Sequence, residues 1–440
     1  MAIIAHRVAQ LKQLSHSVFD AASVRTICVE LDHQWRDRLL DPVMTLHLFL
    51  LQILNGNVAC RCVRHLAEMD FSPTAYSQAR KRLPLALFKQ LAHLLVAKAI
   101  DSGPTPGLWH GLRVLLIDGS GASMPDTKAL QKRFGQPGRV KAGCGFPVMH
   151  VLWLFDAATG MVLDLIPNRC HTHDMADAPL LHPALRRGDL LVGDRGFCSF
   201  AHLALLAQRG VHAVFRVHQK QIIDFRRNRR CRQQCPKGQR RGRPTSRYVK
   251  YLGKHDQLVR WVKPKQKPDW MSDADYAALP DELLLRELRY TTPKRKGYRS
   301  TTITIVTTLT DAEAYPKDEL AALYHARWQI EVDLRHLKQT MGMDVLRCKT
   351  ADGVLKELWV YMMVYNLVRL SILEAAGKQG CDPDRISFID ALDTLRYRGR
   401  DAPIADLMVN PDRPGRNRPR RIKRRKDRYT YLTHPMKRAA

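Results

Sequence analysis

Two short apolar runs, each ending in an aspartate, constrain the fold of this chain most strongly. Residues 113–118 read RVLLID and residues 189–194 read DLLVGD. Short apolar runs bounded by turn signals are typical of strands buried inside a sheet. Between them, the apolar runs 146–156 and 161–167 flank the turn sequence DAATG and predict a β-hairpin.

The segments that follow alternate between helical and extended patterns. This order, three strands and then alternating helices and strands, predicts an α/β fold with a mixed sheet and flanking helices. The predicted helices cover 173–187, 199–208, 316–340 and about 354–376, and the predicted strands cover 211–217 and 299–309.

The first 110 residues predict helices, since apolar residues recur every three or four positions. One of these helices begins at Pro73 after an N-cap serine and ends before Pro84. It carries Arg80 and Arg82, so it fits either the DNA-recognition helix of a helix-turn-helix-like unit or an ordinary solvated basic helix.

The charge of the chain indicates a polyanionic partner. Lys and Arg number 72 against 42 Asp and Glu, which gives a formal net charge of +30. Nucleic acid is the usual partner of so basic a protein, because basic side chains release counterions from the phosphate backbone. The basic residues cluster in 218–297, which reads as a strand-containing insertion between core strands, and in the tail after residue 410.

Nothing in the composition indicates secretion or a membrane. The N-terminus lacks a basic segment followed by a long apolar one, so no signal peptide is expected. The apolar run over 43–54 is too short for a membrane span. The ten cysteines form no regular framework and fit reduced thiols inside a cell.

Three carboxylates stand out by position. Asp118 and Asp194 each end a predicted core strand, and Glu331 lies on the long helix after the last strand. Acids at strand ends fall at the carboxyl edge of an α/β sheet, where ligand sites usually lie. Three such oxygen ligands suit Mg²⁺ or Mn²⁺. Two of these ions, about 3.5–4 Å apart, can promote phosphoryl transfer.

The same helix carries cations on the face of Glu331. At about 100° per residue, Tyr324, Arg327, Glu331 and Lys338 share an arc of roughly 60°. Arg335 lies beside this face, whereas Asp333 lies opposite and is a poor candidate ligand. An amphipathic helix with a polar exposed face explains part of this pattern equally well.

These residues carry a family resemblance. The pattern Tyr324-x2-Arg327-x3-Glu331-x6-Lys338 resembles the signature of DDE transposases in the group named insertion sequence four. The resemblance covers roughly 70–380 and implies an RNase H-like core with a β-rich insertion before the glutamate. Other similar boxes are 117–120 followed by MPDT, GCGFPVMH at 143–150, VGDRGF at 192–197 and KELWVYMMVYNLVR at 356–369.

The resemblance also implies roles for the signature residues. Asp118, Asp194 and Glu331 would ligate two Mg²⁺ or Mn²⁺ ions. Arg327 and Lys338 would hold DNA phosphates, and Tyr324 would position the backbone near the cut. In related enzymes an aromatic of the insertion can stack on a flipped base, and Trp261 and Trp270 are the tryptophans available for this.

Three nearby acids are not expected to be metal ligands. Asp126 lies in a loop, Asp156 in the hairpin turn, and Asp174 at a helix start, where an acid favours the helix dipole.

The predicted function is transposition of an insertion sequence. The enzyme would bind the terminal inverted repeats in double-stranded DNA, free a 3′-hydroxyl and transfer it to the other strand or to target DNA. Cutting both ends in one complex implies a homodimer on DNA, and the expected location is the cytoplasm, at the bacterial nucleoid. An RNase H-like nuclease that only hydrolyses, or a DNA-binding regulator derived from a transposase, is the alternative.

The sequence divides into five expected units. These are a helical DNA-binding unit (1–110), two parts of the catalytic core (111–217 and 298–376), the basic insertion (218–297) and a C-terminal region with the basic tail (377–440).

The basic tail yields the first prediction. Residues 413–438 hold twelve Lys or Arg against one acid, so the tail should contact phosphates without reading bases. Truncation after residue 410 should weaken binding to all DNA alike, and each lost phosphate contact should flatten the slope of log affinity against log salt by about 0.9. Binding isotherms at several salt concentrations measure this slope. An unchanged slope, or a lost preference for the element ends, would contradict the prediction.

Overall fold

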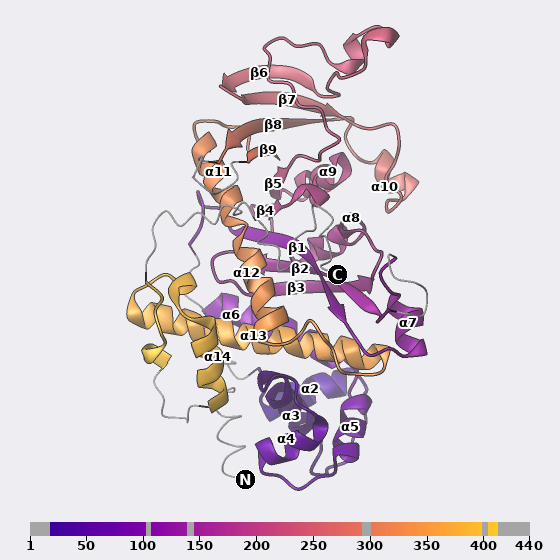
Figure 1. Ribbon diagram of the computed structural model, residues 1–440, viewed down its shortest axis with the longest axis vertical. Helices are drawn as coiled ribbons and strands as arrows, with labels where there is room; N and C mark the ends of the chain where they lie inside the picture. The colour runs from indigo at the N-terminus through magenta and orange to yellow at the C-terminus, as the bar shows by residue number, and fades with distance from the viewer. Residues whose placement is uncertain (1–17, 103–106, 139–144, 293–300, 398–403, 412–440) are drawn as a thin grey trace, which may run out of the picture.

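A nine-stranded mixed sheet forms the centre of the structure, a computed structural model that describes residues 18–102, 107–138, 145–292, 301–397 and 404–411 (Figure 1). The strands follow the order β3-β2-β1-β4-β5-β9-β8-β7-β6 across the sheet. They are β1 (Val114–Ser123), β2 (Val148–Asp156), β3 (Val162–Arg169), β4 (Leu190–Gly193), β5 (His212–Arg216), β6 (Arg247–Gly253), β7 (Asp256–Val262), β8 (Glu282–Thr291) and β9 (Thr302–Thr307).

The first five strands form the RNase H-like half of the sheet that the resemblance implies. The hairpin β2–β3 pairs antiparallel with β1, and β4 and β5 follow on the other side of β1 in parallel. The predicted α/β fold class is therefore confirmed, including the hairpin, the strand that carries Asp118 and the strand that precedes Asp194.

β1 is longer than its apolar run predicts. Its parallel pairing with β4 ends at Ile117 opposite Gly193, but its antiparallel pairing with β2 continues to Ser123 opposite Val148. Asp118 therefore lies within β1 and not at its end. Asp118 is the first residue of β1 beyond its pairing with β4. From this point, in the described part of the chain, one edge of β1 has no neighbouring strand, which leaves room for a site beside it.

The predicted β-rich insertion extends the same sheet. β9 pairs with β5 on one side and with β8 on the other, and β7 and β6 continue outward from β8. In Figure 1 these strands form the upper end of the molecule, beyond β5. A short helix, α10 (Asp273–Ala277), lies in the connection between β7 and β8.

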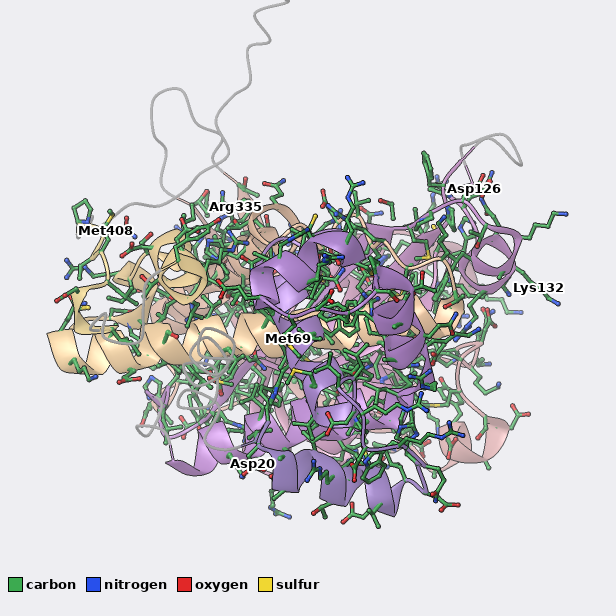
Figure 2. The ribbon with its side chains drawn as sticks, turned by 90° about the horizontal axis from the view of Figure 1, so that it is seen from below. Asp20, Met69, Asp126, Lys132, Arg335 and Met408 are labelled. Carbon is green, nitrogen blue, oxygen red and sulfur yellow. The ribbon has the colours of Figure 1, made fainter. Side chains whose placement is uncertain are left out.

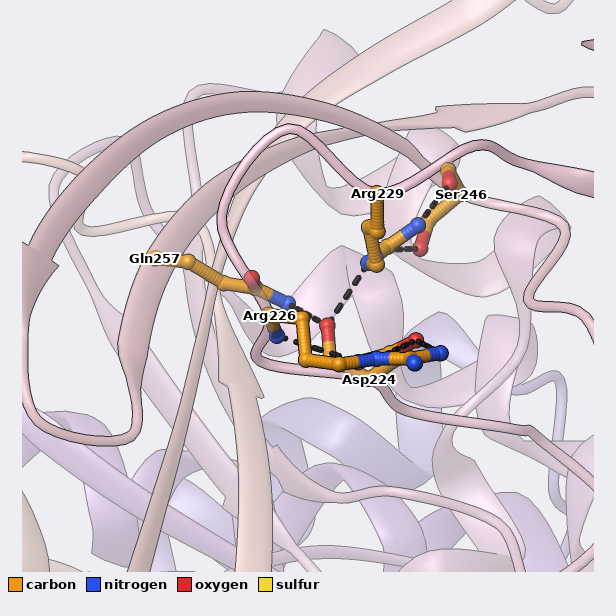
Figure 3. Close-up of polar contacts among 5 residues, drawn as sticks. All are labelled: Asp224, Arg226, Arg229, Ser246 and Gln257. Carbon is orange, nitrogen blue, oxygen red and sulfur yellow. Dashed lines mark hydrogen bonds and ion pairs between the residues drawn. The ribbon is translucent and has the colours of Figure 1, made fainter.

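A basic loop between β5 and β6 is held in place by a buried arginine. The Arg229 guanidinium donates to the Asp224 carbonyl oxygen at 2.6 Å and to the Ser246 carbonyl and hydroxyl oxygens at 2.7 Å each (Figure 3). Gln257 on β7 donates to the same Asp224 carbonyl at 3.0 Å. These bonds anchor the loop to the sheet, while Arg226, Arg227 and other cations of the loop are exposed.

In the described part of the chain before β1, five helices precede the sheet, in agreement with the helical pattern of this region. They are α2 (Ala21–Glu30), α3 (Pro42–Leu54), α4 (Cys60–Ala67), α5 (Pro73–Arg82) and α6 (Leu85–Ser102). The predicted start of α5 is confirmed, because the Ser72 hydroxyl accepts a hydrogen bond from the Ala75 amide at 3.0 Å.

The long helix α13 (Ala351–Gln379) joins these helices to the sheet. It packs against α3 and α6 and against β3, and crosses the lower end of the sheet in Figure 1. It is long and apolar enough to span a membrane, but 83% of its apolar window is buried inside the protein. The buried Glu357 carboxylate binds the Arg347 and Cys348 amides at 2.8 and 2.9 Å and also the Asn57 side chain.

Two predicted helices are wrong in detail. The helix predicted over 173–187 is one α-helical turn, α8 (Asp174–Asp177), followed by the 3₁₀ helix η1 (Ala178–Ala184). Pro179 and Pro183 lack the amide hydrogens that an α-helix needs. The remaining helices are α7 (Lys128–Phe134), α9 (Phe200–Gln208) and α14 (Phe388–Tyr397), with the short 3₁₀ helices η2 (Arg195–Phe197), η3 (Arg232–Gln234), η4 (Lys237–Gln239), η6 (Pro383–Arg385) and η7 (Ile404–Asp406).

The helix predicted over 316–340 is divided into three pieces. They are α11 (Lys317–Ala326), α12 (Gln329–Arg335) and a π-helical turn, η5 (His336–Thr340). Around Arg327 the chain tightens to three-residue hydrogen bonds, as from the Trp328 amide to the His325 carbonyl at 3.2 Å. A constant 100° per residue therefore does not hold across this segment.

The β2–β3 turn provides a prediction about stability. Gly160 has a φ of +65°, and a Cβ at this position would lie 2.3 Å from Nη2 of the buried Arg369. Gly160→Ala should therefore lower the free energy of unfolding by about 1–3 kcal/mol. Urea unfolding would measure it, with Gly377→Ala in α13 as the control, because that Cβ meets no atom within 4 Å. The control should gain about 0.5–1 kcal/mol. Equal stability of Gly160→Ala and the natural protein would contradict this account.

Candidate active site

The three predicted acids lie around one arginine. Asp118 is on β1, Asp194 directly follows β4, and Glu331 is on α12, which runs along the face of the sheet (Figure 1). Nη1 of Arg327 lies 3.6 Å from Asp118 Oδ2, and its Nη2 lies 3.6 Å from Glu331 Oε1. The guanidinium thus links the acid of the sheet to the acid of the helix.

Asp118 lies in an environment that disfavours its negative charge. Burial raises the pKa of the Asp118 carboxyl to about 6. The positive charge of Arg327 and the Gly119 amide oppose this shift, whereas the negative charges of Asp194 and Asp174 add to it. An additional cation beside Asp118 would stabilise its ionised form.

Glycines next to Asp194 fix the orientation of its carboxylate. Asp194 Oδ1 accepts a hydrogen bond from the Gly196 amide at 2.6 Å, and a Cβ on Gly196 would lie 2.9 Å from that oxygen. A Cβ on Gly193 would lie 2.9 Å from the Ile117 side chain, so only glycine allows this close approach to β1. The glycines on either side of Asp194, at 193 and 196, are therefore required by the close packing around its carboxylate.

Tyr324 also lies at this site, although it is buried. Its ring centroid is 5.7 Å from Cζ of Arg327, and its exposed fraction is only 6%. Burial is the main cause of the raised pKa of its phenol. The structure thus brings together five sequence-predicted residues: Asp118, Asp194, Tyr324, Arg327 and Glu331.

Arg335 and Lys338 lie further along the same segment. Arg335 is exposed and lies on the outer surface of the molecule (Figure 2). Lys338 is half-buried in the π-helical turn. Among the described residues, no ion pair links either side chain to the three acids, so both stand apart from the cluster around Arg327.

Asp333 faces away from the site, as the helix geometry predicts. Its side chain is 1% exposed and lies near Tyr365 and Arg369 of α13. Burial raises its pKa to about 7. Asp333 and Glu331 therefore lie in different surroundings although two positions separate them.

Two of the three acids set aside in the sequence have structural roles. Asp156 is buried and its Oδ1 accepts hydrogen bonds from the Ala158 and Thr159 amides in the β2–β3 turn, at 3.1 and 2.9 Å. Asp126 is exposed at the edge of the molecule (Figure 2), and its Oδ1 accepts a hydrogen bond from the Gln131 side-chain amide at 2.9 Å.

The third acid, Asp174, lies close to the cluster, a position that the sequence pattern did not predict. Its Oδ1 lies 2.9 Å from Nε2 of His150, and its charge acts on Asp118. His150 ends the GCGFPVMH box, which was the available signal in the sequence.

Arg80 does not point toward solvent, so its predicted contact with DNA is not supported. Its guanidinium donates to Gln52 Oε1 at 2.7 Å and to Cys348 Sγ at 2.9 Å, and lies 3.9 Å from the Phe49 ring centroid. The Arg80 side chain is therefore directed into the protein, where it contacts polar partners from distant parts of the chain.

Arg82, two residues on, is exposed and remains a candidate for DNA contact. It lines a groove of about 820 Å³ together with other basic and aromatic side chains. We call this the N-terminal basic groove; its lining includes Trp35, Arg36, Arg38 and Arg82.

The two tryptophans of the insertion are used in packing. Trp261 is 6% exposed, and its Nε1 donates to the buried Glu287 carboxylate at 2.8 Å. Trp270 is partly buried against the hydrophobic core. The ring of Trp261 is therefore withheld from solvent, whereas that of Trp270 is partly exposed.

The acids offer suitable oxygen ligands for a divalent cation, but their carboxylates do not converge closely enough to coordinate one ion together. Carboxylate oxygens are the ligands that Mg²⁺ and Mn²⁺ prefer. In the part of the chain that the structure describes, no three His, Cys, Asp or Glu side chains are gathered closely enough to hold an ion. Arg327 contacts two of the acids and supplies the positive charge there.

Three comparisons relate the chain to known proteins. The profile of the family described as "Transposase DDE domain" matches residues 109–367. The transposase InsG for insertion sequence element IS4, from Escherichia coli strain K12, is 26% identical over 386 residues, which cover 83% of this chain and 79% of that protein. A cryo-EM structure of the piggyBac transposase synaptic complex with hairpin DNA aligns with 89% of this chain and 79% of its own, with a TM-score of 0.46 and 12% identity.

Proposed function

Because the chain belongs to the transposase DDE domain family, whose members cleave and join DNA with divalent metals, we propose that Asp118, Asp194 and Glu331 are its metal ligands. The resemblance to insertion sequence four transposases is confirmed by the family match and by the relative. The observation that carries the proposal is the convergence of two of these acids, from β1 and α12, on Arg327, with Asp194 nearby directly after β4.

The three acids would hold two Mg²⁺ or Mn²⁺ ions. Such a pair activates a water molecule or hydroxyl and stabilises the leaving oxygen of the phosphodiester. No protein nucleophile is needed for this reaction. The acids supply oxygen ligands from three elements, and β1 and β4 fix the spacing of two of them.

Arg327 would bind the phosphate near the cut. Its guanidinium lies between acids of two elements and is itself largely buried against Tyr324. A guanidinium in this place can donate two parallel hydrogen bonds to a phosphate. Lys338 and Arg335, further along the segment, would extend the contact with the backbone of the same strand.

The basic surfaces would bind duplex DNA away from the cut. The N-terminal basic groove offers Arg36, Arg38 and Arg82 beside Trp35, and the loop between β5 and β6 offers exposed arginines on an anchored backbone. We infer that the groove contributes to recognition of the terminal inverted repeats. Two copies of the chain on one DNA complex, in the cytoplasm at the nucleoid, complete the proposal.

A plasmid excision assay separates transposition from the alternatives. A nuclease that only hydrolyses would cut the element ends without joining them, and a regulator would bind without cutting. The presence of all three acids around one site favours an enzyme.

Substitution of the acids gives a direct prediction. Asp118→Asn, Asp194→Asn and Glu331→Gln should each slow cleavage by about 1000-fold, since the metals supply several kcal/mol of charge stabilisation. Binding to element ends should survive because it rests on basic groups. Nicking rates of the purified variants, with gel-shift assays for binding, measure both effects.

Asp333→Asn is the matched control for Glu331→Gln. Asp333 lies two positions away on α12 but faces α13, and burial already favours its neutral form. This variant should cleave at nearly the natural rate. Normal cleavage by Glu331→Gln, or equal losses in the two variants, would show that the ligand is wrongly assigned.

The metal requirement yields a separate prediction. Cleavage should need Mg²⁺ or Mn²⁺, while Ca²⁺ should support DNA binding without cutting because it takes looser coordination geometry. Single-turnover nicking with each ion, and with EDTA as the blank, measures this. Full cleavage in EDTA is the contradicting result.

A further inference from the structure

A fourth carboxylate, that of Asp174, lies close to the backbone just after Asp118 and just after Asp194. Asp174 begins α8. A Cβ built on Gly119 would lie 2.5 Å from Asp174 Oδ1, so this oxygen touches the backbone directly after Asp118. Its Oδ2 lies 3.9 Å from the corresponding position on Gly196, two residues after Asp194.

His150 holds this carboxylate from the opposite side. It lies on β2, where it pairs in register with Gly121 of β1. Its Nε2 lies 2.9 Å from Asp174 Oδ1 and 2.8 Å from the position that a Cβ on Gly119 would take. The space next to Asp118 is thus filled by the pair of His150 and Asp174, and only glycine at 119 leaves room for it.

The pair leaves polar atoms unsatisfied. His150 Nδ1 is buried and has no hydrogen-bond partner among the described residues, and Asp174 Oδ1 is buried against His150 Nε2 at 2.9 Å, a contact that becomes an ion pair when His150 is protonated. A buried carboxylate oxygen with a single partner keeps a lone pair that a cation or a water molecule can satisfy. Placing this oxygen beside Asp118 and Asp194 adds like-charge repulsion, which a bound cation relieves.

The helix dipole is not a sufficient reason for this acid. α8 is a single turn of four residues, and its N-cap is His173, whose Nδ1 already accepts the Met175 amide at 3.2 Å. The sequence pattern assigned Asp174 to the dipole of a long helix that the structure does not contain.

We propose that Asp174, held by His150, is a positioning residue of the divalent-cation site, where its charge beside Asp118 and Asp194 strengthens cation binding. This inference rests on the proposed function, because it assumes that the cation binds at these acids. A purely structural ion pair is the competing explanation. It would change stability and leave cation affinity unchanged.

Manganese binding to the full chain without DNA separates these explanations. Free Mn²⁺ is measured by electron paramagnetic resonance during titration of the natural protein and of each variant. Asp174→Asn should weaken Mn²⁺ binding by about 10-fold or more, the range observed when partners around metal ligands are removed. His150→Gln keeps a hydrogen-bond donor toward Asp174, so it should weaken binding by a smaller factor.

The chain offers a matched control pair. His93 Nε2 and Asp164 Oδ1 lie 3.1 Å apart between α6 and β3, away from the acids. Asp164→Asn should leave Mn²⁺ affinity unchanged. Urea unfolding of every variant reports any loss of stability independently of affinity.

Asp118→Asn distinguishes failure of this inference from failure of the proposed function. Natural affinity in Asp174→Asn, with weakened affinity in Asp118→Asn, overturns the role of Asp174 alone. Natural affinity in Asp118→Asn overturns the proposed cation site. If Asp174→Asn does not fold, His150→Gln decides, and unchanged Mn²⁺ affinity in that variant overturns the inference.

Discussion

Repulsion among partly buried carboxylates is the constraint on which the site depends. β1 and β4 run in parallel, so the chain places Asp118 and Asp194 side by side where β4 ends. α12 adds Glu331, and α8 adds Asp174. Arg327 offsets part of this charge, but the pKa of Asp118 still rises to about 6. The fold thus holds negative charges close together, where a bound cation would stabilise their ionised forms.

The remainder of the molecule carries the opposite charge. With a net charge of +30, the chain attracts DNA to its surface, whereas the acids repel phosphate from the site itself. Under the proposed function, bound cations would offset the charge of the acids before a phosphate approaches them. Glu357 of α13 binds Asn57 of the N-terminal helical part and the amides of Arg347 and Cys348 in the loop before α13. The buried helix α13 therefore connects the N-terminal helices to the segment that follows η5.

Local patterns in the sequence predicted the elements better than their ends. The strands, the hairpin and the cap of α5 follow from apolar runs and turn residues. The length of β1 does not, because residues 119–123 pair with β2 without being continuously apolar. The break at Arg327 arises from tight hydrogen bonds that a helical pattern cannot reveal.

The site could be predicted only in part, because local patterns place residues on elements but do not show which distant side chains meet. Asp118, Asp194 and Glu331 were selected from the ends of two apolar runs and from spacing on the long helix, and their role as metal ligands stays a prediction. The inward turn of Arg80 depends on Gln52 and Cys348, which are 28 and 268 residues away in the chain, and the place of Asp174 depends on packing against Gly119. Such contacts are set by tertiary structure, so residue spacing carries no signal for them.

Iron-mediated cleavage of the polypeptide tests the central claim most directly. Fe²⁺ bound in place of Mg²⁺ generates hydroxyl radicals in the presence of ascorbate and peroxide, and these cut the chain beside the metal ligands. The account predicts fragments that end near residues 118, 194 and 331 and that disappear when Mg²⁺ is added in excess. Cleavage concentrated elsewhere, or cleavage at these positions that Mg²⁺ does not suppress, would contradict the assignment of the cation site.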